Sequence, residues 1–192
     1  MTTRILCFAG SARRESLNKK LARLAAAAVR EAGGEATFVD LEDFPLPVYH
    51  GDLEAREGVP PGARTLAELL RGHHGLLIAS PENNASVSAL LKNTIDWLSR
   101  IREFDAFGGQ VAALAAASPG AFGGVRGLYH LRAILNTLGC EVLASQFLLP
   151  RANQAFDAEG QLVDAGSRER LAALARRLLQ AAAASGAQSR PL

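Results

Sequence analysis

Short, continuously apolar runs alternate with longer stretches of helical periodicity along this chain. Strands are expected in the apolar runs at residues 4–9, 36–40, 75–80, 110–117 and 141–148. Helices are expected at residues 17–32, 61–70, 87–100, 125–138 and 168–184. The first, third and fourth runs are apolar almost throughout, which is typical of parallel strands covered by helices on both faces.

Five strand–helix units of this length predict an α/β fold, with a three-layer, doubly wound, five-stranded parallel sheet. The 192 residues suit one domain, which we expect at residues 1–184, followed by a flexible tail at residues 185–192. Such sheets bind ligands at the carboxyl ends of their strands. Functional residues are therefore expected in the loops after the first, third and fourth strands. The longest polar loop, residues 49–62, is expected to be a lid or an interface element.

The loop after the first strand carries a dense set of donors at Gly10, Ser11, Arg13, Ser16 and Asn18. It lies before a predicted helix, where free backbone N–H groups and the helix dipole favour an anion. Hydroxyl, amide and guanidinium donors together suit a phosphate monoester. For Ser16 alone, the alternative is a simple helix cap. Neither the GxGxxG nor the Walker pattern is present, which disfavours a standard NAD or ATP loop.

The loop after the third strand reads Pro81-Glu82-Asn83-Asn84. Its backbone amides and the Asn84 side chain could face the polar edge of a planar heterocycle. The alternative for the two asparagines is an Asx turn that ends the strand.

Composition excludes several classes of function. The net charge of +2 and the absence of long charge runs argue against a nucleic-acid partner. No apolar run approaches the length of a membrane helix. Cys7 and Cys140 form no CxxC pair or Cys/His cluster, so metal binding is not expected, and reduced thiols suggest a cytoplasmic protein. The basic pairs at residues 13–14 and 19–20 are expected to form a local anion site.

Three motifs together resemble the NAD(P)H-dependent FMN reductase family of the flavodoxin-like superfamily, which includes bacterial quinone, chromate and azo-compound reductases. The motifs are Gly10-Ser11-x-Arg13-x-x-Ser16-x-Asn18, Pro81-Glu82-x-Asn84 and Leu91-Lys92-Asn93-Thr94-Ile95-Asp96-Trp97. The resemblance covers nearly the whole chain, including Phe156-Asp157-Ala158-Glu159-Gly160. It implies a flavodoxin-like fold with strand order 2-1-3-4-5.

The resemblance also implies two sets of cofactor-binding residues. The FMN phosphate would be held by Ser11, Arg13, Ser16, the backbone of Leu17, and Asn18. The ribityl chain and ring edge would be lined by Pro81, Glu82, Asn83 and Asn84, with Ser118 on the other side of the ring. Asn83 stands where the family usually has tyrosine, so an aromatic contribution at that point is lost.

The function implied is an FMN-dependent oxidoreductase. Hydride would pass from NAD(P)H through bound FMN to a quinone, free flavin, nitro or azo compound, or metal oxyanion. No residues resemble a nucleophile triad or a carboxylate pair, so no catalytic side chain is expected, because the flavin carries the chemistry.

Two other functions remain as alternatives. A flavodoxin-like electron carrier is disfavoured by the sequence pI near 8.8 and by the arginine in the loop. An interaction protein without flavin is disfavoured by the retained phosphate-loop donors. The resemblance further implies a homodimer or homotetramer, with residues 92–97 and 49–62 as candidate contacts.

Overall fold

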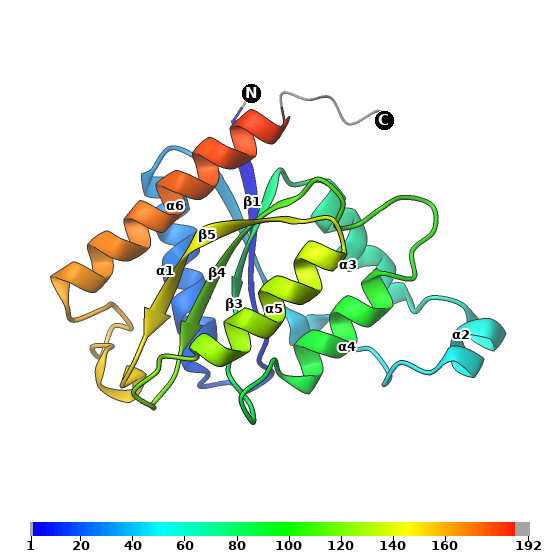
Figure 1. Cartoon of the computed structure of the whole chain (residues 1–192), viewed down its shortest axis with the longest axis horizontal. Coiled ribbons are helices and arrows are strands. Elements are labelled where there is room, and N and C mark those ends of the chain that lie inside the picture. Colours follow the sequence, from blue (N-terminus) through cyan, green and yellow to red (C-terminus); the bar gives the residue numbers. More distant parts are fainter. Residues whose placement is uncertain (1, 187–192) are drawn as a thin grey trace.

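The computed structural model describes residues 2–186, and one parallel sheet lies at their centre (Figure 1). Its strands are β1 (Arg4–Ala9), β2 (Glu35–Asp40), β3 (Gly75–Ala79), β4 (Val111–Ala117) and β5 (Glu141–Leu149). Their order is β2-β1-β3-β4-β5, and every neighbouring pair is parallel. The predicted flavodoxin-like order 2-1-3-4-5 is therefore confirmed.

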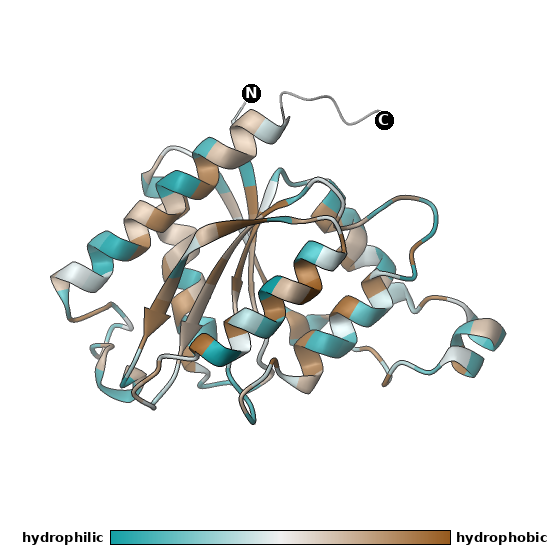
Figure 2. Cartoon of the chain, viewed as in Figure 1, coloured by the Kyte–Doolittle hydropathy of each residue, from teal (hydrophilic) through white to brown (hydrophobic). Residues whose placement is uncertain are grey.

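Helices cover both faces of the sheet and complete three layers (Figure 1). They are α1 (Leu17–Glu31), α2 (Gly51–Glu57), α3 (Pro61–Arg71), α4 (Ala89–Leu98), α5 (Val125–Thr137) and α6 (Ala165–Gly186), with short 3₁₀ turns at Leu41–Asp43 and Ala152–Gln154. In β1, Ile5 and Cys7 pack toward α1 and α6, while Leu6 and Phe8 pack toward α3, α4 and α5. This two-sided burial explains why the central strands are apolar throughout (Figure 2).

The structure differs from expectation in the polar loop and at the C-terminal helix. The segment expected to be a polar loop contains α2, which has no buried residue and therefore no apolar periodicity for a sequence pattern to reveal. The helix α6 extends to Gly186, two residues past its expected end at residue 184. The rest of that expected tail, residues 187–192, lies outside the described residues. None of the described helices combines the length and apolar character needed to cross a membrane.

The segment that carries α2, residues 47–58, is here called the arm, and α4 holds its root. Trp97 Nε1 and Asn93 Nδ2 both donate to the carbonyl oxygen of Pro47, at 2.7 and 2.9 Å. Asn93 Oδ1 accepts from the Tyr49 N–H at 2.8 Å, and the Tyr49 and Trp97 rings pack edge to face. The two segments expected to contact a partner chain therefore contact each other within one chain.

The N-terminus of α5 is held by a residue from another loop. Its N-cap, Gly124, has no side chain, and Glu82 Oε2 accepts from the N–H groups of Arg126 and Gly127 at 3.0 and 3.3 Å. Glu82 Oε1 accepts from Arg126 Nε at 2.7 Å and pairs with its terminal nitrogen. Burial alone would raise the pKa of Glu82, but the Arg126 and Gly127 hydrogen bonds outweigh it and lower that pKa.

Removing the Trp97–Pro47 hydrogen bond should release the arm. For Trp97→Phe, we expect the free energy of unfolding to fall by about 1–3 kcal/mol, because a partly buried hydrogen bond is lost and a small cavity is left. Trypsin should also cut faster after Arg56 in the exposed helix α2, as mass spectrometry of the fragments would show. The exposed Tyr129→Phe serves as the control. Cleavage at the wild-type rate would show that this contact does not hold the arm.

The Glu82 contacts should also make stability depend on pH. A carboxyl with a lowered pKa stabilises the fold above its unfolded pKa of about 4.3, and this contribution is lost as pH falls through the folded pKa. At pH 7, wild type should be more stable than Glu82→Gln by about 2 kcal/mol, the typical value for hydrogen bonds to a charged group. The difference should shrink between about pH 5 and pH 3. Urea unfolding across this range measures it, and a difference independent of pH would contradict the assignment.

Candidate functional site

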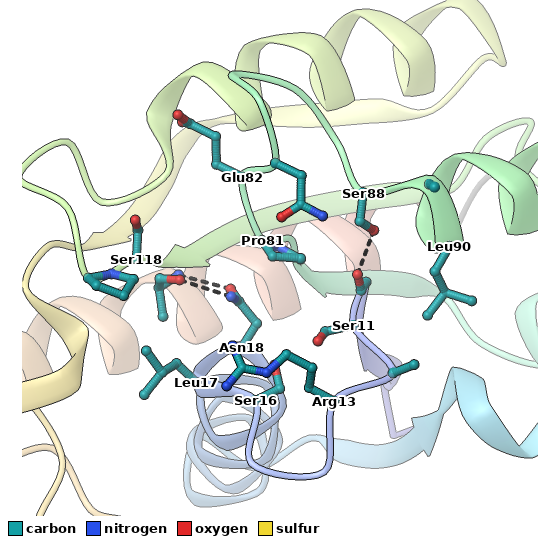
Figure 3. A pocket seen from close by; sticks show the side chains of 16 residues that line it. Ser11, Arg13, Ser16, Leu17, Asn18, Pro81, Glu82, Ser88, Leu90 and Ser118 are labelled. Carbon is teal, nitrogen blue, oxygen red and sulfur yellow. Dashed lines mark hydrogen bonds between the residues drawn. The ribbon is translucent and has the colours of Figure 1, made fainter.

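A cavity of about 370 Å³ lies at the carboxyl ends of β1, β3 and β4 (Figure 3), the edge where the sequence pattern predicts a ligand. Its lining comes from three segments, within residues 10–18, 81–90 and 117–119. The predicted site residues that line it are Ser11, Arg13, Ser16, Leu17, Asn18, Pro81, Glu82, Asn83 and Ser118. Asn84 instead lines a neighbouring hollow together with Lys92 and His130.

One end of the cavity is rich in donors. Figure 3 shows the Ser11 side chain pointing into the enclosed space and the Arg13 side chain reaching back toward Ser16 and the first turn of α1. Ser16 is buried and is also the N-cap of α1, since its Oγ accepts from the Lys19 N–H at 3.3 Å. The helix-cap interpretation and the cavity-lining interpretation of Ser16 are thus compatible. The positive end of the α1 dipole is directed at this end of the cavity.

Asn18 connects two walls of the cavity. Its Nδ2 donates to the carbonyl oxygen of Ala117, and its Oδ1 accepts from the Ala117 N–H, both at 2.9 Å. Both residues are buried, and Ala117 is the last residue of β4. The pairing holds the first turn of α1 against the end of β4, while Asn18 still lines the cavity.

Lys19 does not belong to the anion site that its sequence position suggests. Its Nζ lies 2.7 Å from Asp40 Oδ2 and 3.3 Å from Glu42 Oε2, and it donates to the Ala12 carbonyl oxygen at 3.2 Å. Burial alone would lower the pKa of Lys19, but the hydrogen bonds to Asp40 and Glu42 raise it. The side chain therefore supports the loop from behind. Of the two basic pairs, Arg13 alone lines the cavity.

The loop after β3 contains a tight hairpin. The backbones of Asn83 and Ser86 exchange two hydrogen bonds, each 2.9 Å long. Between them, Asn84 and Ala85 have φ angles of 49° and 63°, the pattern of a two-residue type I′ turn. This turn is closed by backbone hydrogen bonds rather than by the asparagine side-chain bond of an Asx turn, and it places Asn84 at its tip, outside the cavity. Positive φ at Ala85 costs roughly 1 kcal/mol that glycine would avoid.

Ser88 joins the loops after β1 and β3, a role that sequence analysis missed. Its Oγ donates to the Gly10 carbonyl oxygen at 2.6 Å and accepts from the Leu91 N–H at 3.1 Å, which caps α4. A Cβ on Gly10 would lie 2.9 Å from Leu91 Cβ, so this close approach requires glycine. Serine just before a helix is the available signal, but a helix expected from residue 87 places Ser88 inside it. The other lining residues that were missed are Ala12, Ala89, Leu90, Ala117 and Pro119.

The remaining predicted residues shape the opposite wall. Figure 3 shows the Glu82 carboxylate directed away from the cavity, toward α5. Ser118 Oγ accepts from the Gly120 N–H at 3.2 Å, and the Ser118 carbonyl oxygen accepts from Ala152 N. These contacts fix the start of the loop between β4 and α5.

The two ends of the cavity differ in chemistry, and FMN has the same asymmetry. Hydroxyl, guanidinium and helix N-terminal donors gather at residues 11–18, while Pro81, Leu90 and Pro119 add apolar surface to the lining. A phosphate suits the first part, and a flat ring system suits the second. Within residues 2–186, the histidine, cysteine and acidic side chains form no cluster suited to a metal ion.

Comparisons with known proteins agree with this chemistry. The family model described as NADPH-dependent FMN reductase matches residues 3–154. The NAD(P)H-dependent FMN reductase of Pseudomonas aeruginosa is 38% identical over 171 residues, which cover 86% of this chain and 88% of the relative. An NADPH:quinone oxidoreductase of Arabidopsis thaliana is 36% identical over 173 residues, covering 88% and 86%.

A solved structure supports the fold independently. It is the flavoenzyme NAD(P)H:(acceptor) oxidoreductase FerB from Paracoccus denitrificans, which superimposes with a TM-score of 0.80 at 24% identity. The superposition covers 95% of this chain and 98% of FerB. The family model matches most of this chain, and two relatives are more than 30% identical to it. This chain therefore belongs to the NADPH-dependent FMN reductase family.

Proposed function

We propose that this chain binds FMN in the cavity at the ends of β1, β3 and β4 and transfers hydride from NAD(P)H to a small acceptor of the quinone class. The observation that carries the proposal is the arrangement of phosphate-type donors at one end of the cavity and apolar walls at the other. The name of the Arabidopsis relative supports quinones as the acceptor class.

The residues at the donor end would hold the phosphate. The Arg13 guanidinium can offer two parallel N–H donors, and the Ser11 hydroxyl and the first turn of α1 add further donors. Leu17 contributes its backbone, because the first N–H groups of a helix have no intrahelical acceptor. Asn18 has one Nδ2 hydrogen beyond the one that it donates to Ala117. Lys19 and Asn18 keep this loop in place before a ligand arrives.

The residues at the other end would orient the ring system and exclude water from it. Pro81 and Asn83 come from the β3 loop, Ser118 from the end of β4, and Glu82 contributes through its backbone. When bound, FMN supplies the hydride-transfer chemistry, so the protein needs no acid–base side chain for that step. The pI near 8.8 and the reductase relatives favour this function over an electron carrier.

The proposal extends to assembly and location. We propose that the chain forms a homodimer or homotetramer. The arm supports this proposal, because its helix α2 has no buried residue and its Val48 is 83% exposed. We also propose a cytoplasmic location, supported by the buried free thiol of Cys7.

Light scattering tests the assembly directly. The chain has a mass of 20.3 kDa, so we expect a particle of two or four times that mass. Val48→Glu should shift the equilibrium toward smaller species, because a charge would be placed on a surface that a partner covers. A wild-type particle of 20.3 kDa at micromolar concentration would contradict the assembly.

Flavin binding and turnover test the function. Purified protein should bind FMN, oxidise NADPH or NADH and reduce benzoquinone. For Arg13→Met, the dissociation constant for FMN should rise by about 10- to 100-fold, because a charge-assisted phosphate contact is lost. Its affinity for riboflavin, which has no phosphate, should not change.

Arg14→Met is the matched control, since Arg14 is a neighbouring exposed arginine that does not line the cavity. Protein that neither binds FMN nor consumes NAD(P)H would contradict the proposed function. An equal loss of FMN affinity in both arginine variants would contradict the placement of the phosphate at Arg13.

A further inference from the structure

We propose that Glu82 is a positioning residue whose carboxylate sets the spacing between the two loops that flank the ring end of the cofactor cavity. The inference rests on the proposed function, because it takes FMN to be the ligand of that cavity. It assigns Glu82 a different role from the direct cofactor contact that its sequence motif suggests. The residue lines the cavity with its backbone, and its side chain acts on the far side of the wall (Figure 3).

The carboxylate bridges two parts of the chain that are 44 residues apart. Glu82 belongs to the loop after β3, which supplies Pro81 and Asn83 to the cavity. Its partners, Arg126 and Gly127, lie in the first turn of α5, directly after the loop that begins at Ser118. The Glu82 contact therefore joins the two walls behind the space between them.

The close approach of α5 to the β3 loop depends on glycines. A Cβ on Gly127 would lie 3.1 Å from the Ser86 carbonyl oxygen and 3.4 Å from Glu82 Cα. At Gly124, φ is +88° and a Cβ would lie 2.7 Å from Ala116 Cβ. These positions let the helix N-terminus reach the Glu82 carboxylate, and the contact is thus built into the backbone on both sides.

The charge on Glu82 makes the contact rigid. Only 8% of its side chain is exposed, and its two oxygens accept from two backbone N–H groups and from the Arg126 guanidinium. Such charge-assisted hydrogen bonds are stronger than neutral ones, so separating the two loops would break three contacts to one carboxylate. The positive end of the α5 dipole adds to this attraction. The Arg126 guanidinium also lies over the Phe122 ring, 5.9 Å from its centre, which connects the pair to the middle of the loop before α5.

The effect of Glu82 should be confined to the ring end. The phosphate end is held by separate contacts, those of Asn18 with Ala117 and of Lys19 with Asp40. The other end of the β3 loop is held by the hydrogen bond from Ser88 to Gly10. Loss of the Glu82 contact should therefore loosen the ring site and leave the phosphate site intact.

The test compares two flavins in a small set of variants. The variants that weaken the contact are Glu82→Ala, Glu82→Gln and Arg126→Met. Glu103→Gln is the matched control, because Glu103 forms an exposed ion pair of 2.7 Å with Arg64 away from this cavity. For each protein, the dissociation constants of FMN and riboflavin, the visible circular dichroism of the bound flavin at saturation, and the melting temperature would be measured.

For Glu82→Ala, the affinities for FMN and riboflavin should fall by the same factor, about tenfold, since both flavins share the ring. The circular dichroism of the saturated flavin should change as well, which a loss of stability alone would not cause. Glu82→Gln should recover part of both effects, because its Oε1 can still accept from the α5 N–H groups. The flavin affinities of Arg126→Met should resemble those of Glu82→Gln. The double variant Glu82→Gln/Arg126→Met should bind flavin no more weakly than either single variant, since both substitutions remove the same ion pair.

Two results would overturn the proposal while leaving the proposed function intact. One is a lower melting temperature with unchanged flavin affinities and circular dichroism, which would make the contact purely structural. The other is a loss of FMN affinity without a loss of riboflavin affinity, which would make Glu82 part of the phosphate site. If Glu82→Ala does not fold, Glu82→Gln and Arg126→Met decide between these results. Wild-type protein that binds neither flavin would overturn the proposed function, and this proposal with it.

Discussion

The paired hydrogen bonds between the Asn18 amide and the Ala117 backbone hold the rest of the site in place. They attach the first turn of α1 to the last residue of β4, across the position of β3 in the sheet. This sets where the α1 N-terminus and its free N–H groups lie relative to the other strand ends. The polar side chains of the loop before α1 then meet those groups at one end of a small cavity. The proposed anion site at this edge rests on parallel strands, one helix start and one buried amide.

The three cavity loops are joined by side-chain contacts to backbone. Asn18 joins the α1 end to β4, Ser88 joins the β3 loop to Gly10, and Glu82 joins the β3 loop to α5. The Asn18 and Ser88 contacts are buried, so an unpaired partner would be costly, and the Glu82 contact is strengthened by its charge. A site assembled in this way is largely preformed. The chemistry that it serves depends on orientation rather than on a reactive side chain, and a preformed site suits that requirement.

The helices and strands could be predicted from the sequence because the patterns that mark them lie within short stretches of the chain. Continuous apolar runs mark central strands such as β4, and the glycines after α1 and α5 mark helix ends. The strand order came from resemblance to a family, as did most of the cavity lining. The direction of Lys19 could not be predicted, because it depends on Asp40 and Glu42 in a different strand and turn. The contact between Glu82 and Arg126 could not be predicted either, because it follows from packing between loops. The helix α2 was missed for another reason, since it has no apolar face.

The central claim is that the phosphate of FMN binds at the N-terminus of α1 and its ring lies toward the β3 loop. A crystal structure of the protein grown with FMN measures this most directly. We predict phosphate oxygens within hydrogen-bond distance of Ser11 and Arg13, with the ring against Pro81 and Asn83. An FMN molecule with its phosphate away from residues 11–18, or seated in the hollow lined by Lys92 and His130, would contradict the account.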